Sequence, residues 1–249
     1  MSLSLLGVGN SGGGAASNGL LTDLLSYYKF EETSGTRTDS HGDRPFDVVT
    51  NAPGVGTGIK DNAIALVRAS DQWVGNNDAS KWTEFNGSAV AAFSLWASKT
   101  GNSTQWLFRS ENGGSGWLSV SITNSAGAAN FKVEVDPSSS WVATTNSPFP
   151  ASGLAHICAS YDGTQPSGVG RVRIWVNGTE VGTGDKSMAG TVPAALDATI
   201  AGKVSVGSYS GAAYDGLVDE FAIWNRVLTP DDVALLYNSG TGLFYGDFS

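Results

Sequence analysis

Short stretches of alternating apolar and polar residues recur along most of the chain. In residues 26–31, Tyr28 and Phe30 fall on one side of the pattern, while Tyr27 and Lys29 fall on the other. A period of two is the pattern of a β-strand with one buried face. The same alternation, separated by clusters of Gly, Asn, Asp and Ser, predicts further strands at 89–98, 105–109, 117–123, 130–135, 154–161 and 171–176.

Two local signals mark a hairpin and a helix. The dipeptide Asn177-Gly178 follows a predicted strand, and both residue types accept the positive φ of a type I′ turn. Near the end of the chain, Thr229 is suited to cap a helix, Pro230 to occupy its first position and Gly240 to end it. The apolar stripe of this helix comprises Val233, Leu236 and Tyr237.

The order of these elements predicts an all-β fold. About a dozen strands without intervening helices are typical of a jelly-roll sandwich of two antiparallel sheets, here with one short C-terminal helix. Residues 7–19 are uncharged and rich in glycine, which is typical of a segment that does not fold alone. We therefore divide the chain into an extended N-terminal arm at 1–22, a sandwich at 23–240 and a C-terminal tail at 241–249.

Charge and cysteine content exclude several classes of protein. The formal net charge is −9, with 14 basic side chains against 23 acidic ones, so the chain lacks the clustered Lys and Arg of a general nucleic-acid binder. Cys158 is the only cysteine, which excludes an internal disulfide, and it shares a predicted buried strand face with His156. Residues 1–16 hold no basic residue and only a short apolar run, so we expect no secretory signal. No later run reaches the ~18 apolar residues of a membrane span.

Several segments resemble laminin-G-like domains, which are concanavalin A-like lectin/glucanase jelly rolls. Residues 25–35 (Leu-Ser-Tyr-Tyr-Lys-Phe-Glu-Glu-Thr-Ser-Gly) are similar to the opening strand and turn of that family, and residues 93–97 to its central aromatic strand. The closing run, 214–229, is the most specific match. Together the matching segments cover about residues 23–240. The resemblance implies a two-sheet jelly roll, a fold that serves many functions.

Residues 19–28 also resemble the lead-in to copies of this domain in tailed-phage virion proteins. This resemblance implies a non-catalytic structural and binding protein of the virion: a capsid decoration, fibre or tail-associated protein. Its arm would contact other assembly proteins, homo-oligomers are compatible with the sequence, and the location would be the virion. A free carbohydrate-binding lectin module for cell-surface glycans is the first alternative. The alternative locations are an extracellular surface and the cytoplasm before assembly. A glycoside hydrolase is the second.

The resemblance also implies a structural Ca²⁺ ion. Related jelly rolls hold calcium with an Asp that lies where the last strand passes the first ones, and Asp219 occupies the matching position. Calcium suits such a place because it accepts six to eight oxygen ligands, including main-chain carbonyls. Asp39, in the turn after the first strand, is the second candidate ligand. The alternatives for Asp219 are an ion pair, for instance with Arg226, and a turn closed by hydrogen bonds to the backbone.

Aromatic side chains are the candidate glycan contacts, because their flat faces stack on sugar rings. Trp141 and Tyr214 are the predicted ligand-binding residues, with loop anchoring or a subunit interface as the alternative. Trp96, Trp175 and Trp224 lie within alternating strands and are predicted to pack in the core. Six aromatic residues lie in or beside polar, Gly-rich segments: Trp73, Trp106, Trp117, Trp141, Tyr209 and Tyr214.

Catalysis is not expected. Glycoside hydrolysis needs two carboxyl groups that face one cleft. Glu134-Val-Asp136 is similar to the start of the Glu-x-Asp-x-x-Glu motif of laminarinase-like hydrolases, but Ser139 stands where the second Glu should be. Pro137 would also interrupt the hydrogen bonds of a central strand. We therefore assign no catalytic residue.

Overall fold

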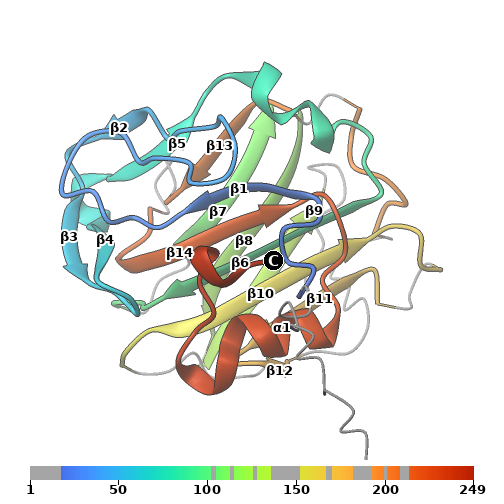
Figure 1. Ribbon diagram of the computed structural model, residues 1–249. Helices are drawn as coiled ribbons and strands as arrows, with labels where there is room; N and C mark the ends of the chain where they lie inside the picture. The colour runs from blue at the N-terminus through green and yellow to red at the C-terminus, as the bar shows by residue number, and fades with distance from the viewer. Residues whose placement is uncertain are drawn as a thin grey trace, which may run out of the picture.

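The computed structural model describes residues 18–101, 105–112, 115–125, 128–135, 152–166, 170–181, 192–198, 201–207 and 213–249. Within these ranges the chain forms fourteen strands and one α-helix (Figure 1). The strands are β1 Leu24–Tyr28, β2 Val48–Thr50, β3 Gly54–Thr57, β4 Asn62–Leu66, β5 Trp73–Asn76, β6 Val90–Ala97, β7 Gln105–Asn112, β8 Ser115–Ser125, β9 Ala128–Val135, β10 Ala155–Asp162, β11 Val172–Val176, β12 Thr179–Glu180, β13 Lys203–Val206 and β14 Gly216–Trp224. The helices are α1 Pro230–Tyr237 and the 3₁₀ segments Arg68–Ser70, Ala79–Phe85, Asn238–Gly240 and Tyr245–Asp247. None of these described helices has the length and apolar character needed to cross a membrane.

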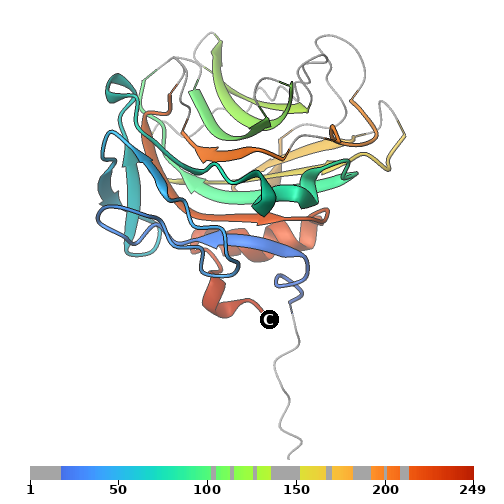
Figure 2. The same ribbon diagram turned by 90° about the horizontal axis from the view of Figure 1, so that it is seen from above.

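The strands pair into two antiparallel sheets. One is eight-stranded, with the order β12-β11-β10-β6-β14-β4-β3 and with β1 paired to β14. The other is six-stranded, with the order β2-β5-β13-β7-β8-β9. The two sheets stack face to face, and α1 lies on the far side of the eight-stranded sheet (Figure 2). The predicted all-β jelly-roll sandwich with one short C-terminal helix is confirmed.

The space between the sheets holds the main hydrophobic core. Alternate residues of each strand point into it, as the period of two predicts. In β1, Tyr28 lies in this core, while its neighbour Tyr27 lies in a second cluster on the other side of the same sheet. The rings of Phe93 on β6 and Phe108 on β7 meet at a centroid distance of 5.0 Å, which joins the two sheets.

The second cluster fills the space between the eight-stranded sheet and the C-terminal segment. Trp224 and Cys158 point into it from the sheet, and Val233 and Leu236 from α1. His156 lies on the same side of β10, and its side chain is buried. The predicted core positions of Cys158, His156, Trp96, Trp175 and Trp224 are therefore confirmed, as all five side chains are buried.

Helix α1 begins where the sequence predicts and ends earlier. The Thr229 side chain accepts a hydrogen bond from the Asp232 backbone N–H at 3.2 Å, and the Asp232 carboxylate accepts one from the Thr229 N–H at 2.8 Å. This reciprocal pair is a capping box. The predicted stop at Gly240 is wrong, because Asn238 already adopts the left-handed conformation with φ 45°. Asn tolerates that region better than most residues, so the helix ends at Tyr237.

The hairpin predicted at Asn177-Gly178 joins β11 to β12. Asn177 has φ 50° and Gly178 has φ 74°, as a type I′ turn requires. A Cβ atom on Gly178 would lie 2.7 Å from the Tyr237 ring. The turn therefore packs against the end of α1 and has room only for glycine.

The two ends of the described body lie together. The Asn18 side chain donates to the Asp247 carbonyl at 2.9 Å and accepts from the Ser249 N–H at 3.1 Å. Leu20 and Phe248 are both buried in the second cluster. Residues 18–22, predicted as the end of an arm, and 241–249, predicted as a tail, thus pack on the sandwich, while residues 1–17 lie outside the described part of the chain.

Candidate functional site

The outer face of the six-stranded sheet collects polar and aromatic side chains. Because Val204 and Val206 of β13 point into the core, Lys203 and Ser205 point away from it. The same alternation places side chains of β5, β7 and β8 on this outer face. We call the set the polar face; it comprises Trp73, Lys203, Ser205, Arg109, Trp106, Ser119 and Ser121.

The register of the strands brings these residues side by side. Ser205 of β13 pairs with Arg109 of β7, which pairs with Ser119 of β8. Trp106 pairs with Ser121 in the neighbouring position. Between them a β-bulge, where the register shifts from Trp106 to Phe108, returns both Trp106 and Arg109 to the outer face.

Cationic groups lie over the two tryptophan rings. The Lys203 Nζ atom is 3.7 Å from the Trp73 ring centroid, and the Arg109 Cζ atom is 5.4 Å from the Trp106 ring centroid. Both distances fall within the ~6 Å range of cation–π attraction. Each ring is thereby fixed in orientation beside an N–H donor.

The polar face has accessible edges and a floor of small side chains. Trp106 and Lys203 are half-buried, whereas the other five side chains are buried: Trp73, Arg109, Ser119, Ser121 and Ser205. Strands β8 and β9 bow toward the other sheet at their middle, so that the outer side of this region is concave (Figure 2). The half-buried Trp106 ring and the half-buried Lys203 ammonium group together offer one apolar and one hydrogen-bonding surface, the combination that a sugar ring presents in turn.

Of the two predicted glycan contacts, only Tyr214 lies within the described residues. Tyr214 is fully buried, and its hydroxyl donates to the Ser98 carbonyl at 2.6 Å, so the prediction of a ligand contact there is wrong. Trp141, together with Asp136 and Ser139, lies outside the described residues. Glu134 pairs with Ser119 in the backbone register of β9 and β8. Trp73 and Trp106, two of the six aromatics singled out from sequence, do lie on the polar face.

Asp219 lies on β14 of the eight-stranded sheet, on the opposite side of the molecule from the polar face. Its neighbour Val218 points into the core between the sheets, so Asp219 points away from that core. Its carboxylate accepts hydrogen bonds from the backbone N–H groups of Ile59 at 2.8 Å, Lys60 at 3.4 Å and Glu220 at 2.9 Å. The alternative of an Asp bonded to the backbone is confirmed. Arg226, the proposed ion-pair partner, instead pairs with Asp232 at 2.8 Å.

Glu220 forms a buried acidic pair with its neighbour. Burial, followed by repulsion from the Glu220 charge, raises the pKa of Asp219 to about 8. Burial likewise raises the pKa of Glu220 to about 7, although the Tyr27 hydroxyl donates to its Oε2 atom. The Oε1 atom of Glu220 is buried without a hydrogen-bond partner.

The calcium prediction concerns the same two carboxylate oxygens of Asp219. Calcium needs six to eight oxygen ligands; N–H groups point at both Asp219 oxygens, and Glu220 Oε1 is buried without a hydrogen-bond partner. Within the described residues, no three His, Cys, Asp or Glu side chains come together in a way that could hold a metal. Calcium at Asp219 stays an untested prediction.

The second predicted metal ligand, Asp39, is also surrounded by backbone donors. Its Oδ1 atom accepts from the N–H groups of Tyr27, His41 and Gly42, each at 3.0 Å. Its Oδ2 atom accepts from the Arg44 N–H at 3.2 Å. Asp39 closes a turn and attaches it to β1, and nothing in this arrangement favours a cation.

His156 is packed rather than poised for catalysis. Its Nε2 atom lies 2.8 Å from the Ser94 hydroxyl, and its ring lies 5.1 Å from the Trp96 ring. Full burial lowers its pKa to about 3, so the ring is neutral in the physiological range. Burial also raises the pKa of Cys158 to about 12, which leaves an inert thiol.

Comparison with known proteins places the chain in a structural context. The sequence profile of the concanavalin A-like lectin/glucanases superfamily matches residues 68–234. No curated protein matches the chain in sequence. Domain 4 of AbnA, a GH43 extracellular arabinanase from Geobacillus stearothermophilus solved with arabinotriose, is similar in fold, with a TM-score of 0.64 and 19% identity over 89% of this chain and 98% of that one.

Two larger structures contain a similar fold. A sialidase from Trypanosoma rangeli has a TM-score of 0.60 and 14% identity, with 88% of this chain and 33% of that chain covered. The binding domain of botulinum neurotoxin DC, solved with SialylT, has a TM-score of 0.57 and 12% identity, with 88% and 52% covered. This chain therefore spans about a third of the sialidase and half of the toxin fragment.

Proposed function

Because the chain belongs to the concanavalin A-like lectin/glucanase superfamily, we propose that it binds carbohydrate on the polar face and carries out no catalysis. The observation that carries this proposal is that Trp106 and Lys203 are half-buried on the concave outer face of the six-stranded sheet, where Arg109 and Trp73 lie against them. Proteins with this fold that were solved with arabinotriose and with SialylT support it by analogy.

The chemistry of the polar face suits a sugar chain. Indole rings present flat apolar surfaces, and Trp106 is half-buried at an accessible edge. Lys203, which is also half-buried, carries N–H donors that suit sugar hydroxyls. Since these groups come from adjacent strands rather than from loops, the sheet holds them at fixed spacing, which lowers the entropy lost on binding.

The absence of catalysis is inferred from the carboxyl groups. Both retaining and inverting glycosidases flank the scissile bond with two carboxyl groups. The buried acidic pair, Asp219 and Glu220, lies on the eight-stranded sheet, away from the polar face. The sequence around Glu134 lacks the second Glu of the hydrolase motif. We therefore propose a binding role alone.

A glycan array probed with the full-length chain tests the proposal. We expect binding to one or a few glycans, and at least tenfold weaker binding by Trp106→Ala, because alanine removes the accessible ring. Leu235→Ala is the matched control, since Leu235 is an exposed apolar residue on α1, far from the six-stranded sheet. No hit on the array, or equal binding by Trp106→Ala and the control, would overturn the proposal.

We also propose, as the setting for this binding, display on a phage virion. The chain reaches the body at Asn18, on the side of the sandwich that carries α1, so an assembly contact through residues 1–17 would leave the polar face free. The net charge of −9 keeps identical copies apart. Deleting residues 1–17 should abolish incorporation into particles and leave the Tm within a few degrees. Normal incorporation of the truncated chain would refute this setting.

A further inference from the structure

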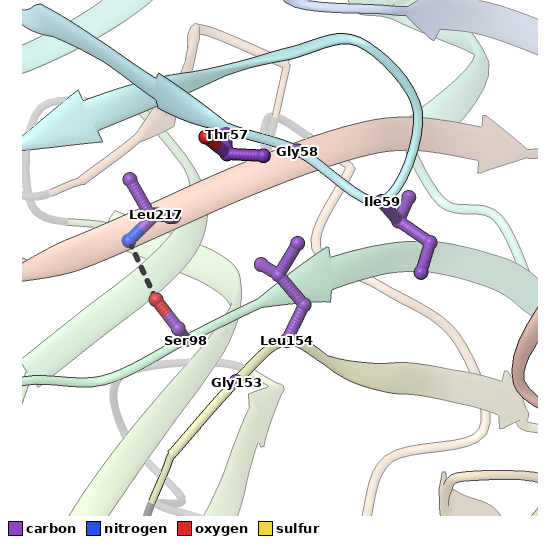
Figure 3. Close-up of a pocket in the computed structure, with 7 residues that line it drawn as sticks. All are labelled: Thr57, Gly58, Ile59, Ser98, Gly153, Leu154 and Leu217. Atoms are coloured by element: carbon purple, nitrogen blue, oxygen red, sulfur yellow. Dashed lines mark hydrogen bonds between the residues drawn. The ribbon is translucent and has the colours of Figure 1, made fainter.

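A small pocket opens on the eight-stranded sheet, on the opposite side of the sandwich from the polar face. Its volume is about 400 Å³. The turn after β3, the end of β6, the start of β10 and the start of β14 surround it (Figure 3). The lining residues are Thr57, Gly58, Ile59, Ser98, Gly153, Leu154 and Leu217.

The lining combines aliphatic side chains with hydroxyls. Ile59, Leu154 and Leu217 supply the apolar surface, and Leu154 points toward the turn that carries Gly58 (Figure 3). The Ser98 hydroxyl accepts a hydrogen bond from the Leu217 N–H at 3.1 Å, so its own proton is available for a ligand. No charged or aromatic side chain is among the described residues that line the pocket.

One wall of the pocket is held rigidly from behind. A Cβ atom on Gly58 would lie 2.3 Å from Asp219 Oδ2 and 2.5 Å from the Asn62 carbonyl, so only glycine fits there. Asp219 in turn accepts the Ile59 N–H at 2.8 Å. The turn that forms this wall is thus fixed in place before any ligand arrives.

We propose that this pocket binds a single neutral sugar residue that carries a methyl group, as acetamido and 6-deoxy sugars do. Ligand pockets span about 300–1,000 Å³, so 400 Å³ suits one ring rather than a chain of rings. The lack of charged side chains among the described lining residues favours a neutral ligand. The Thr57 and Ser98 hydroxyls suit its ring substituents, and the three aliphatic side chains suit its methyl group. The inference rests on the proposed carbohydrate binding and adds a second subsite on the other sheet.

Calorimetric titration of the full chain with methyl glycosides tests the pocket. We expect the glycosides of N-acetylglucosamine and 6-deoxyglucose to bind at least about fourfold more tightly than that of glucose, because one buried methyl contributes about that factor. If only one of the two binds, it identifies which substituent the pocket accepts. Equal affinity for all three glycosides would overturn the proposal.

Two matched variants locate the binding. Thr57→Trp should fill the pocket and weaken binding at least tenfold, whereas Val55→Trp, at an exposed position on the same strand outside the pocket, should leave it unchanged. Leu154→Ala provides a second test, with a loss of about fourfold or more. Melting curves confirm that each variant folds.

Failure of this inference and of the proposed function can be told apart. Binding that Trp106→Ala abolishes and Thr57→Trp leaves intact would refute the pocket and support the polar face. Binding lost only in Thr57→Trp would support the pocket and refute the polar face. A chain that binds no glycan and no glycoside would refute both.

Discussion

Replacing Glu220 with Gln should make the protein more stable at alkaline pH. Glu220 is 4% exposed, and it lies beside Asp219, whose carboxyl group is also buried. Glutamine has nearly the same shape as glutamate and keeps an oxygen that can accept the Tyr27 hydroxyl proton. The substitution therefore removes an ionisable group without opening a cavity.

The size of the effect follows from the pKa of Glu220. Burial raises that pKa from 4.5 to about 7, and each pKa unit corresponds to about 1.4 kcal/mol. Below pH 4.5 the group is protonated in both the folded and the unfolded state. Between pH 4.5 and pH 7 the folded state binds the extra proton, so the free energy of unfolding falls as the pH rises, by about 3 kcal/mol in total. Asp219, whose pKa rises to about 8, adds a fall in the same direction.

Urea unfolding between pH 4 and pH 9 in the presence of EDTA measures this dependence. We expect the free energy of unfolding of the unmodified chain to fall across the range. We expect Glu220→Gln to be equally stable at pH 4 and about 3 kcal/mol more stable at pH 8. Asp61→Asn serves as the control, because Asp61 is an exposed carboxyl with φ 55°, a conformation that Asn accepts.

Two results would refute this reasoning. If the free energy of unfolding stays level or rises from pH 4 to pH 8, other interactions must stabilise the ionised carboxylates of Asp219 and Glu220 in the folded state. A Glu220→Gln variant less stable than the unmodified chain at pH 8 would show that the charge itself is needed.

Three further predictions concern the cap, one turn and the metal. Thr229→Ala should lower the free energy of unfolding by about 1 kcal/mol in urea, because it removes the capping box; a loss below about 0.3 kcal/mol would contradict this. Gly178→Ala should lower the Tm more than Gly35→Ala, since both have φ near +74° but only the first would meet the Tyr237 ring; the reverse order would be inconsistent with this packing. Because N–H groups point at both Asp219 oxygens, EDTA should leave the Tm unchanged; a fall of several degrees, with calcium found by elemental analysis, would contradict this and support calcium at Asp219.

Local features of the fold were predictable because they depend on neighbouring residues. The alternation that separates Tyr27 from Tyr28 is visible in the sequence, and the two rings do lie in different clusters. The start of α1 was predictable because Thr229 and Pro230 act within one turn. The end was not, since Asn238 competes with Gly240 for the left-handed position and lies closer to the helix.

Contacts between distant segments could not be predicted in the same way. Asp219 bonds to Ile59 and Lys60, which lie about 160 residues earlier in the chain. Arg226 lies closer in sequence to Asp232 than to Asp219 by only one residue, and nothing local to these positions distinguishes the two partners. Which of the two carboxylates pairs with Arg226 depends on the β-bulge in β14 and on the packing of α1.

The candidate site shows the same division. Tyr214 lies in a Gly-rich segment that suggests exposure, yet its side chain is fully buried, and its hydroxyl donates to the carbonyl of Ser98, just after β6. The polar face draws on β5, β7, β8 and β13, and the β-bulge at Trp106 decides which side that ring takes. The alternation of Lys203 and Ser205 with Val204 and Val206 is visible in the sequence and indicates a strand with one polar face. Which side chains lie beside that polar face depends on which strands pair, and the sequence does not show this.

The pairing of Asn18 with Ser249 fixes how any attached polypeptide would orient this domain. Both residues lie beyond the second cluster, on the α1 side of the sandwich, so a tether joined at either residue leaves from one and the same pole. A force applied through such a tether would act on the second cluster, in which Leu20 and Phe248 are buried. The concave outer face of the six-stranded sheet would point away from the tether, on the opposite side of the molecule. Fusion partners, surface anchors or labels joined at either residue should thus hold the molecule in one orientation.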